Sequence, residues 1–273
     1  MRILLTNDDG IKAEGLRVLR AALLRYVPDI DLLVVAPDGN RSAMARSITT
    51  RRPLWVEEAA FDDGSIGYAT DGTPVDCVRL ANLGLVDGWR PEMVVAGINH
   101  GSNLGDDITY SGTVAAALEA IVLGIPGVAV SQQSAALEMD FRQSAAFDFA
   151  VAADFAGRLV ADLDARPMPP DTLLNVNVPG CVPEGVTVAR LGKRIYRDEL
   201  SLVEEGEPGR RLYRIYGEAT DHDGQLDTDI SAVEHHRIAV TPLHFDLTHH
   251  EGIAALADHD LARLLRDPVT PEL

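Results

Sequence analysis

The 273-residue sequence has little cysteine and little positive charge, and each shortage excludes a class of protein. Its two cysteines, Cys77 and Cys181, lie in apolar stretches, which suits buried reduced thiols rather than a disulfide framework. Lys and Arg number 24 against 42 Asp and Glu, giving a net charge of −18. Such a surface repels phosphate backbones and anionic lipid, so neither duplex nucleic acid nor a membrane is an expected partner.

Long hydrophobic runs and two nucleotide-binding motifs are also missing. No apolar run is long enough to span a bilayer, and the first ten residues do not resemble a secretory signal, so we expect a cytoplasmic protein. No GxGxxG follows the first predicted strand, and no GxxxxGK[ST] loop occurs. Hydrophobic residues make up 46% of the chain and charged residues 24%, the ordinary proportions of a folded globular protein.

Short apolar segments alternate with helical patterns along the first 190 residues. Continuous apolar runs, typical of strands buried on both faces, occur at 3–6, 31–36, 93–96, 127–131 and 173–178. Helical spacing runs from Leu16 up to Pro28, over about 112–123, and from Phe147 to Leu163. This alternation predicts an α/β fold, namely a Rossmann-like three-layer αβα sandwich around a mostly parallel sheet.

The sequence changes character after about residue 190. Short strand candidates at 211–216 and 237–241 lie between polar, Gly- and Asp-rich stretches, and a last helix is expected over 253–265. We interpret residues 1–190 as an α/β catalytic core. Residues 191–273 then form a C-terminal extension of β-hairpin and helix within the same domain.

An acidic cluster follows the first predicted strand, where Asn7, Asp8 and Asp9 occur in succession. Ligands of open parallel sheets bind beyond the carboxyl ends of the strands, so a site is expected at this place. Two adjacent carboxylates repel each other unless a cation lies between them or one keeps its proton. Oxygen ligands favour a hard divalent ion over zinc. The alternative at this stage is an ordinary turn with an Asp that caps the first helix.

A second candidate loop, GINHGSNLGDDITYSGT at 97–113, follows the strand at 93–96 and leads into a helix. Its length without predicted structure is typical of functional loops. Asn99 and Asn103 offer amide oxygens. Ser111, Gly112 and Thr113 lie at the N-terminus of the helix that follows. Free N–H groups at a helix N-terminus can hold a phosphate. Ordinary Ser/Thr capping is the alternative interpretation.

A third loop, Asn40-Arg41-Ser42, follows the strand at 31–36. Ser42 offers a hydroxyl oxygen, and Arg41 can counter a phosphate charge. Taken alone, this loop indicates little. Three such loops after three parallel strands would converge on one crevice. Ordinary turn sequences do not account for polar residues in all three loops.

Five segments resemble the SurE family, the survival-protein-type 5′-nucleotidases, and occur in the family's order: MRILLTNDDG, APDGNRSAMARSIT, TDGTPVDCV, AGINHGSNLGDDITYSGTVAAALEA and VTPLHFDLT. The resemblance implies a metal-dependent phosphatase that hydrolyses nucleoside 5′-monophosphates to nucleoside and phosphate, with short-chain polyphosphate as a further substrate. One departure from the family pattern is SAMARS, which replaces a more Gly-rich version after Ser42.

The resemblance also implies roles for individual residues. One divalent ion per subunit, Mg²⁺ or Mn²⁺, would be held by Asp8, Asp9, Ser42 and Asn99. Asp8 and Asp9 are the expected catalytic residues, with Asp8 as general base for a water molecule or as direct nucleophile. The expected substrate contacts are Asn7, Asn40, Asn103, Ser111, Gly112 and Thr113. Family members form homodimers or homotetramers by exchanging C-terminal elements, which implies the same use for residues 191–273.

Three alternatives use the same acidic cluster. A receiver-type phosphoacceptor would bind Mg²⁺ with it, but the chain is more than twice the length needed, and no Lys follows the strand at 127–131 before residue 193. A haloacid-dehalogenase-type phosphatase needs two carboxylates separated by one residue, a spacing that the adjacent Asp8 and Asp9 do not have. The third alternative is a non-catalytic nucleotide-binding module.

Overall fold

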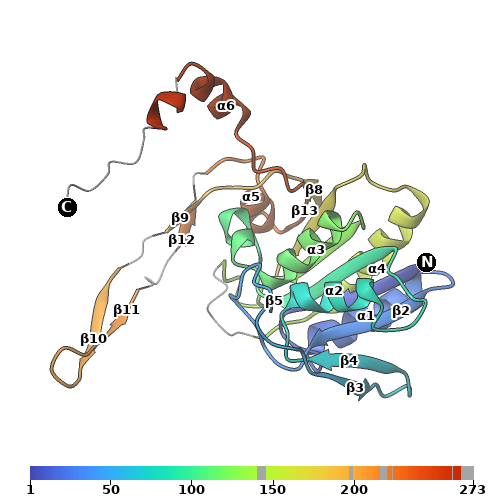
Figure 1. The fold of residues 1–273 in the computed structure, drawn as a ribbon. Coiled ribbons are helices and arrows are strands. Elements are labelled where there is room, and N and C mark those ends of the chain that lie inside the picture. Colours follow the sequence, from blue (N-terminus) through green and yellow to red (C-terminus); the bar gives the residue numbers. More distant parts are fainter. Residues whose placement is uncertain (140–145, 197–198, 216–219, 223, 260, 266–273) are drawn as a thin grey trace.

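The computed structural model describes residues 1–139, 146–196, 199–215, 220–222, 224–259 and 261–265. Over these residues the body of the protein is a nine-stranded sheet in the order β3-β4-β2-β1-β5-β6-β7-β13-β8 (Figure 1). The pairs β3–β4 and β7–β13 are antiparallel and the others parallel. The strands are β1 (Arg2–Thr6), β2 (Asp31–Pro37), β3 (Val56–Ala60), β4 (Ile66–Thr70), β5 (Met93–His100), β6 (Gly127–Gln132), β7 (Leu173–Val178), β8 (Gly185–Val188) and β13 (Arg237–Leu243).

Helices cover both faces of this sheet (Figure 1). The helices of the body are α1 (Glu14–Tyr26), α2 (Pro74–Leu83), α3 (Gly112–Val122), α4 (Ala150–Ala165) and α5 (Asp229–Glu234). Buried residues of α1 and α4, such as Leu16 and Ala156, form one apolar cluster against the sheet. Those of α2 and α3, such as Cys77 and Ala116, form a second. The predicted three-layer αβα architecture is therefore confirmed.

The helix α2 and the hairpin β3–β4 were not predicted from periodicity. Helix α2 begins at a capping box, in which the Thr73 hydroxyl accepts from Asp76 N and the Asp76 carboxylate accepts from Thr73 N. It ends at Gly84, whose φ of 104° is left-handed. Strand β3 lies at the sheet edge with a mixed, largely exposed pattern, so it lacks the apolar run that marks a central strand.

Most of the segment 97–113, which was expected to be one long loop, has regular secondary structure, so that prediction was wrong. Strand β5 continues to His100, with a shift of register against β6 between Ala96 and Asn99. A 3₁₀ helix, η1 (Gly105–Thr109), follows before α3. A search for apolar periodicity does not detect these elements, because the segment is rich in Gly and Asn. Polar contacts, rather than apolar packing, hold the strand end and η1.

The C-terminal part of the chain contributes to the sheet as well as to an arm outside it. Strand β13 lies between β7 and β8, so the sheet itself crosses the predicted boundary at residue 190. The strand pairs β9 (Arg194–Tyr196)–β12 (Thr220–His222) and β10 (Ser201–Glu205)–β11 (Arg211–Arg214) extend away from the body (Figure 1). The strand expected over 211–216 thus ends at Arg214, and residue 216 lies outside the described residues.

The helix expected over 253–265 is present as two shorter pieces, α6 (His250–Ala257) and η2 (Leu261–Leu264). Residue 260 lies outside the described residues. Helix α6 stands away from the sheet (Figure 1), and none of its residues is buried. No described helix combines the length and the apolar character needed to cross a bilayer.

Candidate active site

The polar loops meet where strand order reverses. Strand β1 pairs in parallel with β2 on one side and with β5 on the other, so the carboxyl ends of the three strands share one edge. In open α/β sheets this reversal opens a crevice for ligands. A pocket of about 40 Å³ lies there, lined by Asp8, Ser42, Ala43, Asn99, His100, Asn103, Asp107, Tyr110 and Ser111.

This pocket is small but polar. Its 40 Å³ exceed the minimum of roughly 10–15 Å³ that holds one water molecule, so an ion or a few small atoms fit. A larger cavity of about 370 Å³ lies beside Met1, Glu92 and Met93, at the amino ends of the strands, where no such set of side chains converges. The small pocket is therefore the better candidate for chemistry.

Asp8 is the most strongly perturbed carboxyl group of the pocket, and it is 3% exposed. Burial and the charge of Asp9 raise its pKa to about 6, although hydrogen bonds from Thr113 act in the opposite direction. The Thr113 hydroxyl donates to Asp8 Oδ1 at 2.5 Å. Gly112 makes this contact sterically feasible, because a Cβ there would lie 2.8 Å from Asp8 Oδ2. The N-terminus of α3 is thereby packed directly onto Asp8.

Asp9 lies beside the pocket rather than in its lining. Its Oδ2 accepts from the backbone N of His100 at 3.2 Å and lies 2.8 Å from the His100 ring Nδ1. Its Oδ1 accepts from Asn40 at 3.3 Å. Burial lowers the pKa of His100, but the contact with Asp9 and the charge of Asp8 outweigh it, so the pKa is raised overall.

Backbone N–H groups of the loop that carries Ser42 donate the hydrogen bonds that hold the loop in place. Arg41 N donates to Asp8 O at 2.6 Å, Ser42 N donates to Asn40 Oδ1 at 2.8 Å, and Ala45 N donates to Tyr110 O at 3.1 Å. Ala43 and Ala45 adopt left-handed φ values of 58° and 50°. These two residues belong to the SAMARS departure, and they keep a conformation that glycine adopts more easily.

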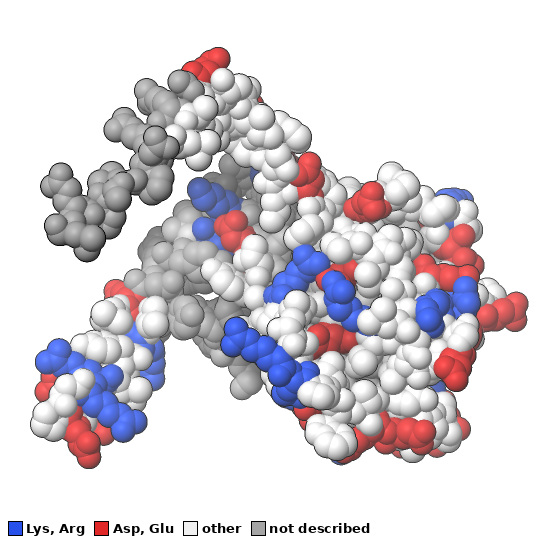
Figure 2. Space-filling view, in the orientation of Figure 1, with Lys and Arg blue, Asp and Glu red and all other residues white. Residues whose placement is uncertain are grey.

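An ion-pair cluster that sequence reasoning missed holds the same loop. Glu119 of α3 is 1% exposed, and its two carboxylate oxygens lie 2.6 Å from Arg46 and from Arg79. Arg46 follows Ser42 in the loop and Arg79 lies on α2, so Glu119 joins three elements. Figure 2 shows Lys and Arg side chains gathered on this face over the region of α2 and α3, despite the negative net charge.

Three predicted substrate contacts differ in their placement. The Asn103 side chain donates to Ser131 at 2.8 Å and lines the pocket. The Ser111 hydroxyl lines it too, while accepting from Val114 N at 3.1 Å as the cap of α3. Asn7 lies outside the lining, because both ends of its amide bind Gly10. Contact between Asn7 and a substrate stays a prediction.

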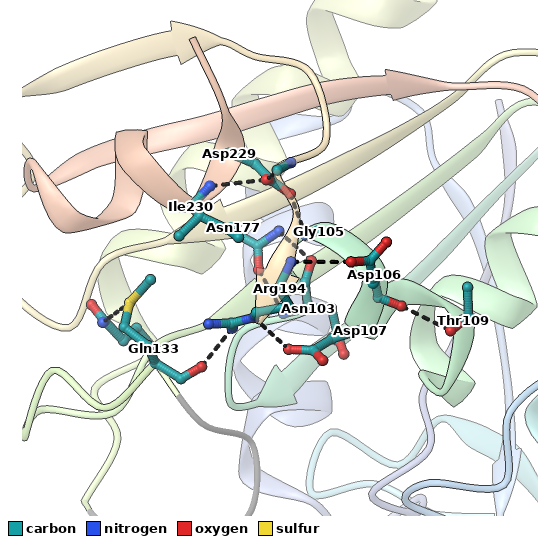
Figure 3. Close-up of polar contacts among 12 residues, drawn as sticks. Asn103, Gly105, Asp106, Asp107, Thr109, Gln133, Asn177, Arg194, Asp229 and Ile230 are labelled. Atoms are coloured by element: carbon teal, nitrogen blue, oxygen red, sulfur yellow. Dashed lines mark hydrogen bonds and ion pairs between the residues drawn. The ribbon is translucent and has the colours of Figure 1, made fainter. Parts of the chain in front are cut away.

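A buried network ties η1 to the C-terminal part of the chain (Figure 3). The Arg194 Nε donates to Asp107 Oδ2 at 2.9 Å, and the two side chains are 1% and 3% exposed. Arg194 N donates to Asp106 Oδ2 at 3.0 Å. Asp229 accepts from Gly105 N at 2.9 Å. Because these partners are more than 80 residues apart, no local pattern in the sequence indicates them.

The donor set fits a hard divalent cation. Asp8, Ser42 and Asn99 line the pocket and Asp9 adjoins it, so two carboxylates, a hydroxyl and an amide oxygen lie close together. Asn99 donates its amide N–H to Gly101 O at 2.8 Å, which leaves its oxygen as the group available to a ligand. Oxygen ligands of this kind suit Mg²⁺ or Mn²⁺.

Comparison with known proteins identifies the family. A family model described as Survival protein SurE matches residues 3–198. This chain belongs to the SurE family. A protein named 5′-nucleotidase SurE from Rubrobacter xylanophilus is 50% identical over 268 residues, covering 97% of this chain and 99% of the relative. A protein of the same name from Chloroflexus aggregans is 44% identical over 94% of this chain and 98% of its own length.

A solved structure of a SurE-family protein agrees with the fold. The crystal structure titled as the SurE protein from Aquifex aeolicus has a TM-score of 0.76 and 34% sequence identity. It covers 94% of this chain and 100% of the other chain. The resemblance to the SurE family seen in the sequence and the predicted α/β fold are thus both confirmed.

Proposed function

We propose that this protein is a metal-dependent 5′-nucleotidase that hydrolyses nucleoside 5′-monophosphates to nucleoside and phosphate. The main support is the convergence of Asp8, Ser42 and Asn99 in one pocket at the N-terminus of α3. Helix N-termini bind phosphate through free N–H groups and the helix dipole. The names of the relatives, 5′-nucleotidase SurE, support the same substrate class.

One Mg²⁺ or Mn²⁺ ion per subunit would be held by Asp8, Asp9, Ser42 and Asn99. When bound, a divalent ion supplies Lewis-acid stabilisation of phosphoryl charge and lowers the pKa of a nearby water molecule. It would also offset the repulsion between Asp8 and Asp9 that raises the pKa of Asp8.

Asp8 is the proposed general base. Burial of Asp8, which persists when an ion is bound, raises the pKa of its carboxyl group and so makes the carboxylate a better proton acceptor for an attacking water molecule. Thr113 donates to Oδ1, so Oδ2 is the atom that receives the proton. The N–H groups at the start of α3, over Ser111, Gly112 and Thr113, would stabilise charge on the equatorial phosphoryl oxygens.

The pocket size restricts which part of the substrate enters. About 40 Å³ accommodates a reacting phosphoryl group but not a nucleoside, which would lie at the mouth beside the half-exposed Tyr110. A terminal phosphate of short polyphosphate would fit the same pocket. Mouth contacts would then set the preference among nucleotides.

The C-terminal elements support assembly into a homodimer or homotetramer. Helix α6 exposes Ile253 and Leu256 by more than half, and the β10–β11 hairpin exposes Leu212 to a similar extent. Exposed apolar side chains on elements that extend from the body are typical of interfaces. We propose that the elements of residues 191–273 that lie outside the sheet, β9 to β12 and α6, exchange between subunits in a cytoplasmic enzyme, around a core of residues 1–190 that α5 and β13 complete.

Phosphate release provides the direct test of the proposed function. A panel of nucleoside 5′-monophosphates is incubated with the protein in EDTA, in Mg²⁺ and in Mn²⁺. We expect release with either ion, loss of release in EDTA, and recovery when the ion is added back in excess. Binding of a monophosphate without release under any condition would support the non-catalytic module instead, and stable phosphorylation of an Asp would support the receiver-type alternative.

Gly112→Ala tests the packing of α3 against Asp8. The new Cβ would lie 2.8 Å from Cβ and Oδ2 of Asp8, so Asp8 must move. Misplacement of a reacting group by about 1 Å can cost about 10²-fold in rate, so we expect kcat of Gly112→Ala to fall by about that factor. Gly206→Ala is the matched control, because its Cβ would meet no atom closer than 3.7 Å. Equal kcat for the two variants in the phosphate-release assay would contradict the expected geometry.

A further inference from the structure

His100 makes two contacts with one oxygen of Asp9. Its backbone N donates to Asp9 Oδ2 at 3.2 Å, and its ring Nδ1 lies 2.8 Å from the same oxygen. The other oxygen, Oδ1, has one longer contact, 3.3 Å from Asn40 Nδ2, in the part of the chain that the structure describes. The protein therefore engages Oδ2 more closely and leaves Oδ1 more open to a ligand.

The ring of His100 is itself held in place by two aromatic side chains. Phe147 meets it edge-to-face with centroids 5.1 Å apart, and Phe149 does so at 4.8 Å. The two phenylalanine rings are stacked on each other, 5.6 Å apart and 7° from parallel. Phe149 is buried directly before α4, so the aromatic group is anchored to the body of the fold. Its edge-to-face contacts restrict rotation of the imidazole.

We propose that His100 is a positioning residue, which orients the Asp9 carboxylate for binding a divalent cation. The inference rests on the proposed function, because it takes Asp9 as a ligand of that cation. Partners that hydrogen-bond a metal ligand fix its orientation, and their loss lowers metal affinity by about 10- to 100-fold. In this arrangement Nδ1 is the ring atom that contacts Oδ2, at 2.8 Å, and it would present its N–H to that oxygen, while Oδ1 would be left for the ion.

Two substitutions separate the donor from the ring. His100→Phe keeps a ring against Phe147 and Phe149 but removes the N–H donor. His100→Asn removes the ring but places an amide N–H where Nδ1 was. If donation to Asp9 is what matters, His100→Phe should lose cation affinity and His100→Asn should retain most of it.

Mn²⁺ binding is measured by electron paramagnetic resonance on the full chain, where bound Mn²⁺ loses the sharp signal of the free ion, and by the Mn²⁺-dependent rise in Tm. We expect the binding midpoint of His100→Phe to rise by about 10- to 100-fold and that of His100→Asn to stay close to wild type. The Tm without metal shows whether each variant is folded.

The outcomes separate this inference from the proposed function. An unchanged midpoint in His100→Phe would overturn the inference while leaving the metal site intact. Equal weakening in both variants would also overturn it, since ring packing rather than the donor would then control Asp9. Absence of Mn²⁺ binding by the wild-type chain would overturn the metal site and the inference together.

Discussion

Replacing Asp8 by Asn is expected to lower the rate of metal-dependent phosphate release by about 10²–10⁴-fold, the usual contribution of a general base. An amide cannot take the proton of the attacking water, and it is a weaker metal ligand than a carboxylate. The loss should appear mainly in kcat, measured with saturating nucleotide and excess Mn²⁺. Asp87→Asn, a change of the same kind at an exposed position, is the control and should retain wild-type kcat.

The same substitution should stabilise the metal-free protein at neutral pH. The pKa of Asp8 is raised from 3.8 to about 6 by burial and by Asp9, so the folded state binds the proton more tightly than the unfolded state. Stability is then lost as pH rises from about 4 to 6, and above that range the full penalty is about 3 kcal/mol. Asn carries no charge and avoids this penalty.

Thermal unfolding in EDTA between pH 4 and pH 8 checks the stability effect. Asp8→Asn should have the higher Tm at pH 8, and the difference should shrink toward pH 4, where Asp8 of the wild type is protonated. A lower Tm for the variant at pH 8 would show that the ionised carboxylate is favourable even without metal. Opposite effects on activity and stability are the expected signature of a strained functional group.

The central strands and the site position could be predicted from the sequence for one physical reason. Strands β1, β2, β5, β6 and β7 are buried on both faces, so each is a continuous apolar run that periodicity detects. Polar residues at or soon after the carboxyl ends of β1, β2 and β5 then fall at one edge of the sheet. Edge strand β3, with exposed Glu57 and Glu58, has no such pattern and was missed.

The residues that hold the loops in place could not be predicted. Glu119 meets Arg46 across 73 positions, and Asp9 meets His100 across 91. Such contacts depend on tertiary packing, and nothing in either local sequence marks the partner. The left-handed backbone at Ala43 and Ala45 could not be predicted for another reason. Glycine is the usual sequence signal for that conformation, and neither position is a glycine.

Replacing Arg194 by Met is expected to destabilise the protein by about 3–5 kcal/mol, the cost of removing one partner of a buried ion pair. The Arg194–Asp107 pair is almost fully buried, so water cannot compensate the charge left on Asp107. Arg194 also donates to Met139 O at 2.6 Å, and this bond is lost as well. Arg211→Met is the control, since Arg211 and Glu205 are both well exposed and such pairs contribute about 0–1 kcal/mol.

Urea unfolding of Asp107→Asn, of Arg194→Met and of the double variant Asp107→Asn/Arg194→Met separates the ion pair from general packing. If loss of the ion pair with Asp107 causes most of the destabilisation, the double variant should be more stable than Arg194→Met alone, because the amide that replaces the Asp107 carboxylate is neutral. Additive losses would instead mean that Arg194 acts through its other contacts.

Since Asp107 lies in both η1 and the pocket lining, hydrogen exchange in Arg194→Met should accelerate first at Gly105–Thr109, which would connect the C-terminal part of the chain to the active site.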